Sequence, residues 1–252
     1  MEAISKIESF VEQMKLKAEK KKQHCDKHQI GYLYSCSQCD AEIKQAQERA
    51  YQVGVLLTQS GIRKRFEKAC FENFKPENHH DQINFKLAKN YADNFDVMKE
   101  NGKNIVMYGG TGTGKNYLAV SIMRELISLY SAKVKVITAY NLIYSINETY
   151  SPNCHKTERQ VKQEYLSYDF LVIDEFDLNR GTESDNLQLF DVINDRYEEM
   201  LPTAIISNLN REQLEKRVGQ RVISRLLDGG VIMKFTGVDR RKNQVCNGGV
   251  KL

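Results

Sequence analysis

A glycine-rich run that ends in a lysine and an asparagine is the first feature of this sequence whose residue types and spacing predict chemistry. It consists of Gly109, Gly110, Thr111, Gly112, Thr113, Gly114, Lys115 and Asn116, and it matches G-x-x-x-x-G-K-[ST] except at the last position. Such glycines let backbone N–H groups surround phosphate oxygens, and the lysine reaches the β- and γ-phosphates. The run therefore predicts a nucleoside triphosphate site. An amide oxygen at Asn116 would bind Mg²⁺ more weakly than a hydroxyl, or through water.

Two pairs of polar residues lie at the ends of later apolar runs. Asp174 and Glu175 form the first pair, and Ser207 and Asn208 form the second. In P-loop ATPases one acid holds Mg²⁺ and another group orients and activates the attacking water. We therefore expect Asp174 to bind Mg²⁺ and Glu175 to act as the base, the alternative being an acidic turn that caps a helix. Asn208 is the preferred group to hold the water, with Ser207 as the alternative.

Arginines recur towards the end of the chain. Arg217, Arg221 and Arg225 are spaced by four residues on one expected helix, in which Gly219 is expected to be only a minor break, and Arg241 follows the last expected strand. A row of arginines is usually a solvated or salt-bridged face. In an ATPase of this pattern it can instead present an arginine finger to a neighbouring subunit. An arginine after the last strand could fold back onto the nucleotide.

Cysteine and histidine cluster near the beginning of the sequence. Cys25 and His28 form one pair, Cys36 and Cys39 form another, and each pair has two intervening residues. Two such pairs can close a tetrahedral Zn²⁺ site. His24 is the alternative to His28, and buried cysteines without a metal are the alternative to the site itself. A module this short has little apolar core, so the metal would supply folding energy.

Alternating strands and helices are expected to position the glycine run, the acids and the arginines. Strands are expected over 104–108, 134–138, 170–173, 203–207 and 231–235, and helices over 85–95, 116–130, 140–150 and 157–166. Strands that alternate with helices of this length form βαβ units. The pattern therefore predicts an α/β fold with a parallel sheet that helices cover on both faces.

The first part of the chain reads differently. An amphipathic helix is expected over 2–22, and a polar helix over 41–58. We expect three regions: an amino-terminal helical and zinc-binding module over 1–58, a flexible linker over 59–80 and an ATPase domain over 81–252. The layout indicates that the amino-terminal module is an arm for a partner.

Composition excludes several classes of protein. The 252 residues are 41% hydrophobic, which excludes a wholly disordered chain, and the net charge of +4 permits nucleic-acid binding without arguing for it. No apolar run approaches the ~20 residues that a membrane-spanning helix needs, and the beginning of the sequence has no signal-peptide pattern. We therefore expect a cytoplasmic protein that does not bind membranes, with cysteines in a reducing compartment.

The motifs together resemble the AAA+ ATPases of the DnaC/DnaI-type replicative helicase loader family. The resemblance spans about 60–245, and it rests on Ser60 to Ile62, Cys70 to Phe74, Gly109 to Asn116, Leu171 to Glu175, Ser207 with Asn208, and Gly219 to Leu226. In having an asparagine after the lysine of the glycine run, the sequence resembles the DnaC branch of this family. The resemblance implies a P-loop ATPase with a five-stranded parallel sheet and with ATP, Mg²⁺ and Zn²⁺ as cofactors.

The resemblance also implies roles for single residues. It implies that Lys115 binds phosphate, that Asp174 binds Mg²⁺ and that Glu175 is the base. Asn208 would be the water sensor. Arg221 would be the trans-acting arginine finger, with Arg225 as the alternative, and Arg241 would be the second sensor. Val238 to Arg241 departs from the family's usual residues before that arginine. The amino-terminal arrangement resembles that of DnaI-type loaders, in which a zinc-bearing module docks onto the helicase.

The expected function is ATP-dependent loading of a hexameric, DnaB-type replicative helicase onto single-stranded DNA, in a cell or a bacteriophage. Self-association through the ATPase domain is expected as well. The main alternative is an IstB-like transposition helper ATPase, against which stand the zinc module and Asn116. A third hypothesis is a zinc-stabilised adaptor whose ATP site has become a degenerate switch.

A DNA path is suggested by two helices between the second and third strands, where the simplest unit has one. Tyr140 and Tyr144 share a helical face, and Lys156, Arg159 and Lys162 lie on the following segment. Stacking on aromatic rings together with cations is typical of sequence-tolerant strand binding. The alternative is that the tyrosines pack their helix onto the sheet.

Overall fold

The computed structural model describes residues 23–32, 36–177 and 182–241. The helix expected over 2–22 lies outside the described residues. By its internal contacts the chain divides into two compact units, Met1–Gln52 and Val53–Leu252. Among the described residues, no helix combines the length and the apolar character that crossing a membrane requires.

The described part of the first unit is a short hairpin followed by a helix. β1 (Gln23–Cys25) pairs antiparallel with β2 (Ile30–Tyr32), and α2 (Ser37–Gln59) follows, of which the residues up to Gln52 belong to this unit. Asp40 lies in the first turn of α2, where a negative charge stabilises the helix dipole. The helix therefore begins earlier than the one expected over 41–58. None of its residues is buried, so a packed apolar core does not hold this element in the first unit.

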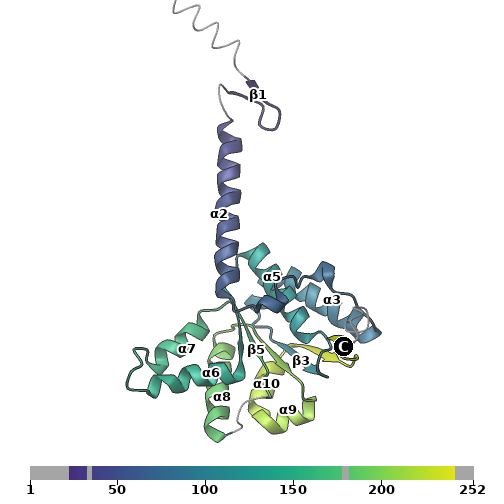
Figure 1. Cartoon of the computed structure of the whole chain (residues 1–252), viewed down its shortest axis with the longest axis vertical. Coiled ribbons are helices and arrows are strands. Elements are labelled where there is room, and N and C mark those ends of the chain that lie inside the picture. Colours follow the sequence, from purple (N-terminus) through teal and green to yellow (C-terminus); the bar gives the residue numbers. More distant parts are fainter. Residues whose placement is uncertain (1–22, 33–35, 178–181, 242–252) are drawn as a thin grey trace, which may run out of the picture. The chain divides into compact units, whose positions relative to one another are not determined.

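The second unit is built on a parallel sheet (Figure 1). Its strands are β3 (Ile105–Gly109), β4 (Val134–Thr138), β5 (Phe170–Asp174), β6 (Thr203–Ser207) and β7 (Val231–Phe235). They lie in the order β4-β5-β6-β3-β7, and every neighbouring pair is parallel. The expected five-stranded parallel sheet is confirmed. Because β6 lies between β3 and β5, the polar residues after β6 reach the edge between the glycine run and the acidic pair.

Successive residues of each strand pack on opposite faces of the sheet. On β3, Val106 joins one hydrophobic cluster, whereas Ile105 and Met107 join another. On β5, Leu171 and Val172 divide in the same way. Both faces are therefore apolar, which explains why these strands read as continuous apolar runs.

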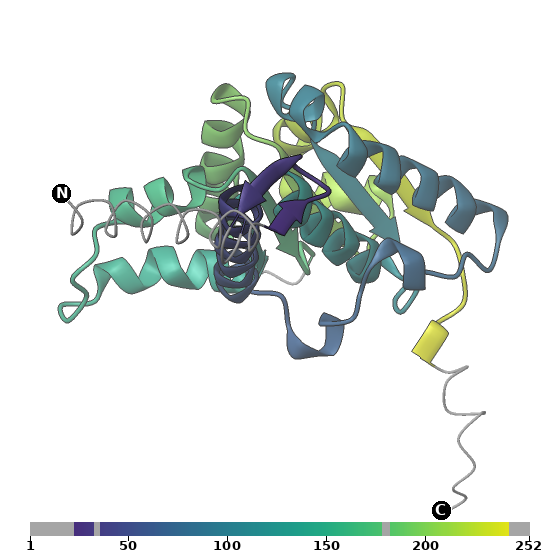
Figure 2. The same ribbon diagram turned by 90° about the horizontal axis from the view of Figure 1, so that it is seen from above.

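Helices cover both faces of this sheet, as expected (Figures 1 and 2). Those that contribute to the cluster around Ile105 are α3 (His79–Asp93), α4 (Phe95–Glu100) and α5 (Lys115–Tyr130). Those that contribute to the other cluster are α6 (Ala139–Asn147), α7 (Glu158–Leu166), α8 (Glu183–Glu198), α9 (Arg211–Val218) and α10 (Gln220–Leu227). Short 3₁₀ turns lie at Lys64–Phe66, Phe71–Asn73 and Glu148–Tyr150.

The segment expected to be a flexible linker over 59–80 is instead anchored in the second unit. The backbone oxygen of Ser60 accepts a hydrogen bond from the Val136 amide of β4 at 2.8 Å, and Ser60 is fully buried. Phe71 and Phe74 are buried beside Phe85 of α3. These rings belong to the hydrophobic cluster around Ile105, and the free energy of their burial holds the segment in place.

The row of arginines expected on one helix lies on two. Gly219 has φ 89°, a conformation that favours glycine, and it separates α9 from α10. Arg217 therefore belongs to α9, whereas Arg221 and Arg225 belong to α10. The expectation of one continuous arginine face was wrong, because the glycine changes the direction of the chain between the first arginine and the second.

Candidate active site and candidate metal centre

The glycine run forms a tight loop between β3 and α5. Gly109, Gly112 and Gly114 have φ values of 132°, 74° and 103°. A Cβ atom at Gly109 would lie 2.0 Å from the backbone oxygen of Phe235, so no larger residue fits there. α5 begins at Lys115, directly after this loop. The loop amides and the amino terminus of the helix together form an arrangement that binds phosphate.

Lys115 is buried at the centre of the loop. Its Nζ donates to the backbone oxygens of Gly109 at 2.7 Å and Gly110 at 2.6 Å, and to Asn208 Oδ1 at 3.0 Å. Burial lowers the pKa of the Lys115 ammonium to about 8, and the charges of Asp177 and Asp174 oppose that shift. The lysine predicted to bind phosphate and the asparagine predicted to hold the water are thus in direct contact.

The acidic pair lies at the end of β5. The Asp174 carboxylate is buried, and it accepts hydrogen bonds from the Glu175 amide at 2.8 Å and from Asn116 Nδ2 at 2.7 Å. Burial raises the pKa of Asp174. Glu175 has φ 51°, a left-handed conformation that costs on the order of 1–3 kcal/mol for a residue other than glycine. Asn116, at the unusual end of the glycine run, therefore contacts the predicted Mg²⁺ ligand.

Asp177 is a site residue that the sequence did not reveal. Its Oδ1 accepts hydrogen bonds from the Ser207 hydroxyl at 2.8 Å and from the Asn208 amide at 3.0 Å. The Ser207 hydroxyl is committed to this bond, whereas the Asn208 side chain reaches Lys115. This arrangement favours Asn208 over Ser207 as the group that faces the phosphates. Its place in the sequence, three residues after the end of β5, gave no signal, because its partners Ser207 and Asn208 follow another strand.

The segment after β7 closes against the glycine loop. The Arg240 amide donates to the Gly112 oxygen at 3.1 Å, and the Arg240 guanidinium lies 4.7 Å from the centre of the Phe74 ring and pairs with Asp81. Arg241, the predicted second sensor, is exposed, and its backbone amide donates to Asp239 at 3.0 Å. The arginine that turns inwards is thus the neighbour of the predicted one.

The two candidates for the finger differ in their surroundings. Arg225 lies over the rings of Phe190 and Tyr197, at 4.9 and 5.8 Å from their centres. Arg221 is exposed near the start of α10. A finger must reach a neighbouring subunit, and the exposed side chain is the better suited of the two.

A cavity of about 280 Å³ lies beside Asp174 and Asn116. Arg63, from the anchored segment after α2, lines it as well. The positive charge of Arg63 lowers the pKa of Asp174 and so opposes the effect of burial. This segment therefore contributes a charge near the predicted Mg²⁺ site, which sequence spacing alone did not indicate.

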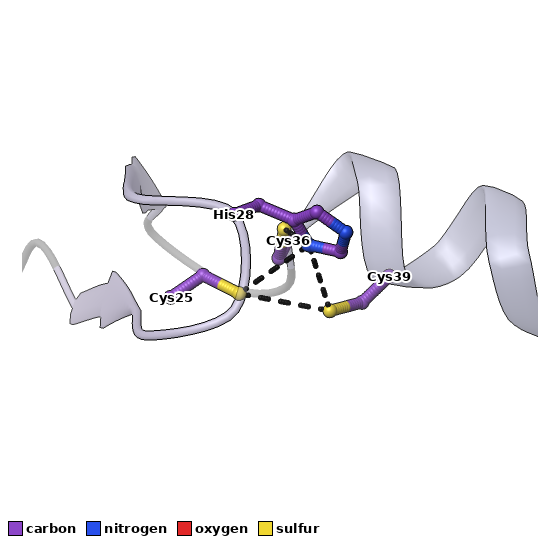
Figure 3. Close-up of side chains that lie close together, drawn as sticks. All are labelled: Cys25, His28, Cys36 and Cys39. Atoms are coloured by element: carbon purple, nitrogen blue, oxygen red, sulfur yellow. Dashed lines mark hydrogen bonds between the residues drawn. The ribbon is translucent and has the colours of Figure 1, made fainter.

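The cysteine and histidine cluster converges in the first unit (Figure 3). His28 Nδ1 lies 3.6, 3.5 and 3.4 Å from the sulfurs of Cys25, Cys36 and Cys39. The sulfurs of Cys25 and Cys39 lie 3.7 Å apart. A tetrahedral Zn²⁺ with bonds of about 2.3 Å to sulfur and about 2.0 Å to nitrogen places its ligands roughly 3.5–3.8 Å apart. The four residues thus fit the metal, and His28 rather than its alternative His24 belongs to the group.

Local structure explains how these ligands meet. Cys25 ends β1, His28 lies in the turn of the hairpin, Cys36 precedes α2 and Cys39 lies in its first turn. The His28 backbone N–H donates to the Cys25 sulfur, and chiefly for this reason the pKa of the Cys25 thiol is lowered, whereas the hydrogen bond with Cys25 raises the pKa of the Cys39 thiol. A thiolate is the form that binds a metal.

Of the residues expected to line a DNA path, the two tyrosines of α6 are exposed, but two of the three cations near α7 are paired within the chain. The rings of Tyr140 and Tyr144 stack with centres 6.3 Å apart, and they are 46% and 51% exposed, so they do not pack α6 onto the sheet. Lys156 pairs with Glu164 at 2.9 Å. Lys162 pairs with Glu158 at 2.8 Å and with Asp191 at 3.0 Å, whereas Arg159 is exposed. Two of the three cations expected to face DNA are thus held in ion pairs within the chain.

The chain is similar to proteins of known families. The model of the IstB-like ATP binding protein family matches residues 11–235. The chain is 29% identical over 180 residues to the replicative helicase loader DnaC of Buchnera aphidicola subsp. Schizaphis graminum, covering 71% of this chain and 72% of that one. It is 27% identical over 199 residues to the replicative helicase loader DnaC of Escherichia coli K12, covering 79% of each.

Solved structures show the same fold. A crystal structure of the DnaC helicase loader matches with a TM-score of 0.62 and 20% identity, over 69% of this chain and 99% of that one. AMPPCP-bound DnaA from Aquifex aeolicus matches with a TM-score of 0.58 and 22% identity, over 73% of this chain and 57% of that one. The strand order, the phosphate-binding loop and these matches lead to one conclusion: the chain belongs to the family of IstB-like ATP-binding proteins and has the AAA+ fold.

Proposed function

We propose that this protein is an ATPase that loads a hexameric replicative DNA helicase onto single-stranded DNA. One observation carries the proposal: Lys115, Asp174 and Asn208 converge at one edge of the sheet, in a chain with curated relatives that are named replicative helicase loaders. The same chemistry would serve a loader of cellular or bacteriophage origin.

The positions of these groups support a proposed ATPase step. Lys115 and the loop amides would bind the β- and γ-phosphates, and Asp174 and Asn116 would hold Mg²⁺, which when bound would neutralise charge on the phosphates. Glu175 accepts the proton of the attacking water, and Asn208 orients that water. We expect slow turnover that helicase or DNA modulates.

Assembly is the second part of the proposal. The exposed guanidinium of Arg221 contacts the phosphates of the nucleotide bound by a neighbouring copy and stabilises their charge. The ATPase unit therefore self-associates when ATP is bound. Arg241 approaches the nucleotide from within the same chain. It lies close enough for its charge to lower the pKa of Lys115.

Residues 1–58 are proposed to dock onto a DnaB-type hexameric helicase. The exposed surface of α2 and the candidate zinc centre support this role, because a metal-held module can present a defined surface without a large core. We expect a fragment of residues 1–58 to bind the helicase by itself. If a fragment of residues 59–252 binds the helicase and the fragment of residues 1–58 does not, the docking surface lies in the second unit instead.

Single-stranded DNA is proposed to contact α6. The stacked, exposed rings of Tyr140 and Tyr144 support this, since base–aromatic stacking contributes about 1–3 kcal/mol per base. Arg159 adds an exposed cation nearby in sequence. The ion pairs of Lys156 and Lys162 make those lysines weaker contributors than the sequence alone indicates.

The transposition-helper alternative has less support. The family model carries the IstB name, but the relatives from Buchnera aphidicola and Escherichia coli described above are named replicative helicase loaders. The four-residue candidate metal site, which also stood against the alternative, is assembled in the structure.

A loading assay on closed circular single-stranded DNA tests the proposal. A helicase ring cannot thread onto a circle from an end, so retention of the cognate hexameric helicase on the circle reports loading. We expect the full chain with ATP to increase retention and Lys115→Ala to abolish the increase. Equal retention with and without the protein, combined with stimulation of a cognate transposase, would overturn the proposal in favour of the alternative.

A further inference from the structure

A carboxylate lies directly behind the candidate metal centre. Glu42 Oε1 is 3.2 Å from His28 Nε2, and Glu42 Oε2 is 2.6 Å from Lys27 Nζ. Glu42 lies on α2, one helical turn after the ligand Cys39. One helix therefore supplies both a metal ligand and a group that contacts another ligand from the far side.

The two nitrogens of the His28 ring face different partners. Nδ1 lies within 3.6 Å of the sulfurs of Cys25, Cys36 and Cys39, whereas Nε2 faces Glu42. A ring nitrogen that binds a metal carries no proton, and the hydrogen bond made by the other nitrogen sets the tautomer. With a metal bound in this arrangement, Nδ1 would be its ligand, and Nε2 would carry the proton and donate it in a hydrogen bond to Glu42.

We propose that Glu42 is a positioning residue of the zinc centre, which fixes His28 as an Nδ1 ligand and orients its ring. This inference rests on the proposal that the four residues bind Zn²⁺. A carboxylate on the outer nitrogen of a ligating histidine raises the basicity of the ligand and restricts the ring. Lys27 contacts the second oxygen of Glu42 and so restricts the carboxylate in turn.

The exposures of these side chains indicate which contact matters more. Lys27 is 66% exposed and Glu42 is 46% exposed, so solvent screens their ion pair. His28 is only 14% exposed, and its bond to Glu42 is better shielded. Removal of Glu42 should therefore weaken the metal site more than removal of Lys27.

The zinc affinity of the full-length protein tests this, measured by competition with a chromophoric zinc chelator. We expect Glu42→Ala to bind Zn²⁺ about 10–100-fold more weakly than the wild type, the usual range for such partners. Glu42→Gln keeps an acceptor oxygen, so its zinc affinity should fall less than that of Glu42→Ala. The zinc affinity of Lys27→Ala should fall least. Glu48→Gln is the matched control on the same helix, because Glu48 pairs with Lys44 at 4.0 Å.

Long-range ¹H–¹⁵N correlation of the zinc-loaded full chain tests the tautomer independently. We expect His28 to show a metal-bound Nδ1 and a protonated Nε2. A metal-bound Nε2, or Glu42→Ala with wild-type zinc affinity, would overturn the role of Glu42 while the zinc site itself stood. Wild-type protein that takes up no zinc would overturn the site and this inference together. Unchanged ATP binding by Glu42→Ala would show that its effect is confined to the first unit.

Discussion

Different interactions stabilise the folds of the two units of this protein. Among the described residues of the first unit, the buried side chains are those of Cys25 and Cys36, both candidate metal ligands. The second unit instead buries two large apolar clusters, one against each face of its sheet. We therefore expect the described part of the first unit to depend on a metal for its fold, whereas burial of apolar surface folds the second unit.

The largest expected effect tests this difference directly. Cys36→Ser removes a ligand, so the first unit should lose its zinc and its described hairpin should unfold, because the described residues there contribute no apolar core that could replace the metal. The second unit should keep its fold and its ATP binding. Metal analysis together with circular dichroism and an ATP-binding assay measures both. Loss of ATP binding in this variant would show that the units do not fold independently.

The reciprocal change lies in the second unit. Lys115→Ala removes the only side-chain cation aimed at the phosphates within the described glycine run, and we expect ATP affinity to fall by about 100-fold or more. A fluorescent ATP analogue measures this, and the zinc content should stay that of the wild type. Wild-type affinity in Lys115→Ala would contradict the assignment of the site.

The pH dependence of ATP binding sharpens the role of Lys115. Burial lowers the pKa of this lysine to about 8, so its ammonium is charged below that pH and loses its proton above it. Because ATP binds the charged form, affinity should be constant below about pH 8 and decline as pH rises further. In Lys115→Arg the decline should disappear, since a guanidinium stays charged. Zinc content should not follow this profile.

A change at Glu175 separates hydrolysis from binding. Glu175→Gln removes the base but keeps the shape of the side chain, so we expect ATP binding to persist and turnover to fall about 10²–10⁴-fold. Release of phosphate over time measures the turnover. Turnover near that of the wild type would assign the base elsewhere.

A smaller effect is expected at Asp177. Asp177→Asn keeps an acceptor for Ser207 and Asn208 but removes the charge near Lys115, so kcat should fall about tenfold with little change in KM for ATP. Without that negative charge the pKa of Lys115 should drop further, and the decline of ATP affinity should begin at a lower pH than in the wild type. An unchanged pH profile would reduce Asp177 to a structural role.

The sequence by itself determined the parts of this protein that depend on local patterns. The glycine run, the acidic pair and the Cys25 to Cys39 ligand spacing were all recognisable, because each places its groups within a few residues or at the end of one strand. The five strands were also predicted, since strands buried on both faces read as short apolar runs. Local periodicity sufficed for the number and type of these elements.

The tertiary structure alone decided which distant residues meet. Asp177 reaches Ser207 because β5 and β6 are neighbours in the sheet, and Arg240 reaches Asp81 across 159 positions of the chain. Lys162 is neutralised by Asp191, on another helix. Each of these contacts depends on the order of strands and the packing of helices. Those are set by the burial of both faces of the sheet together, and no single stretch of sequence specifies them.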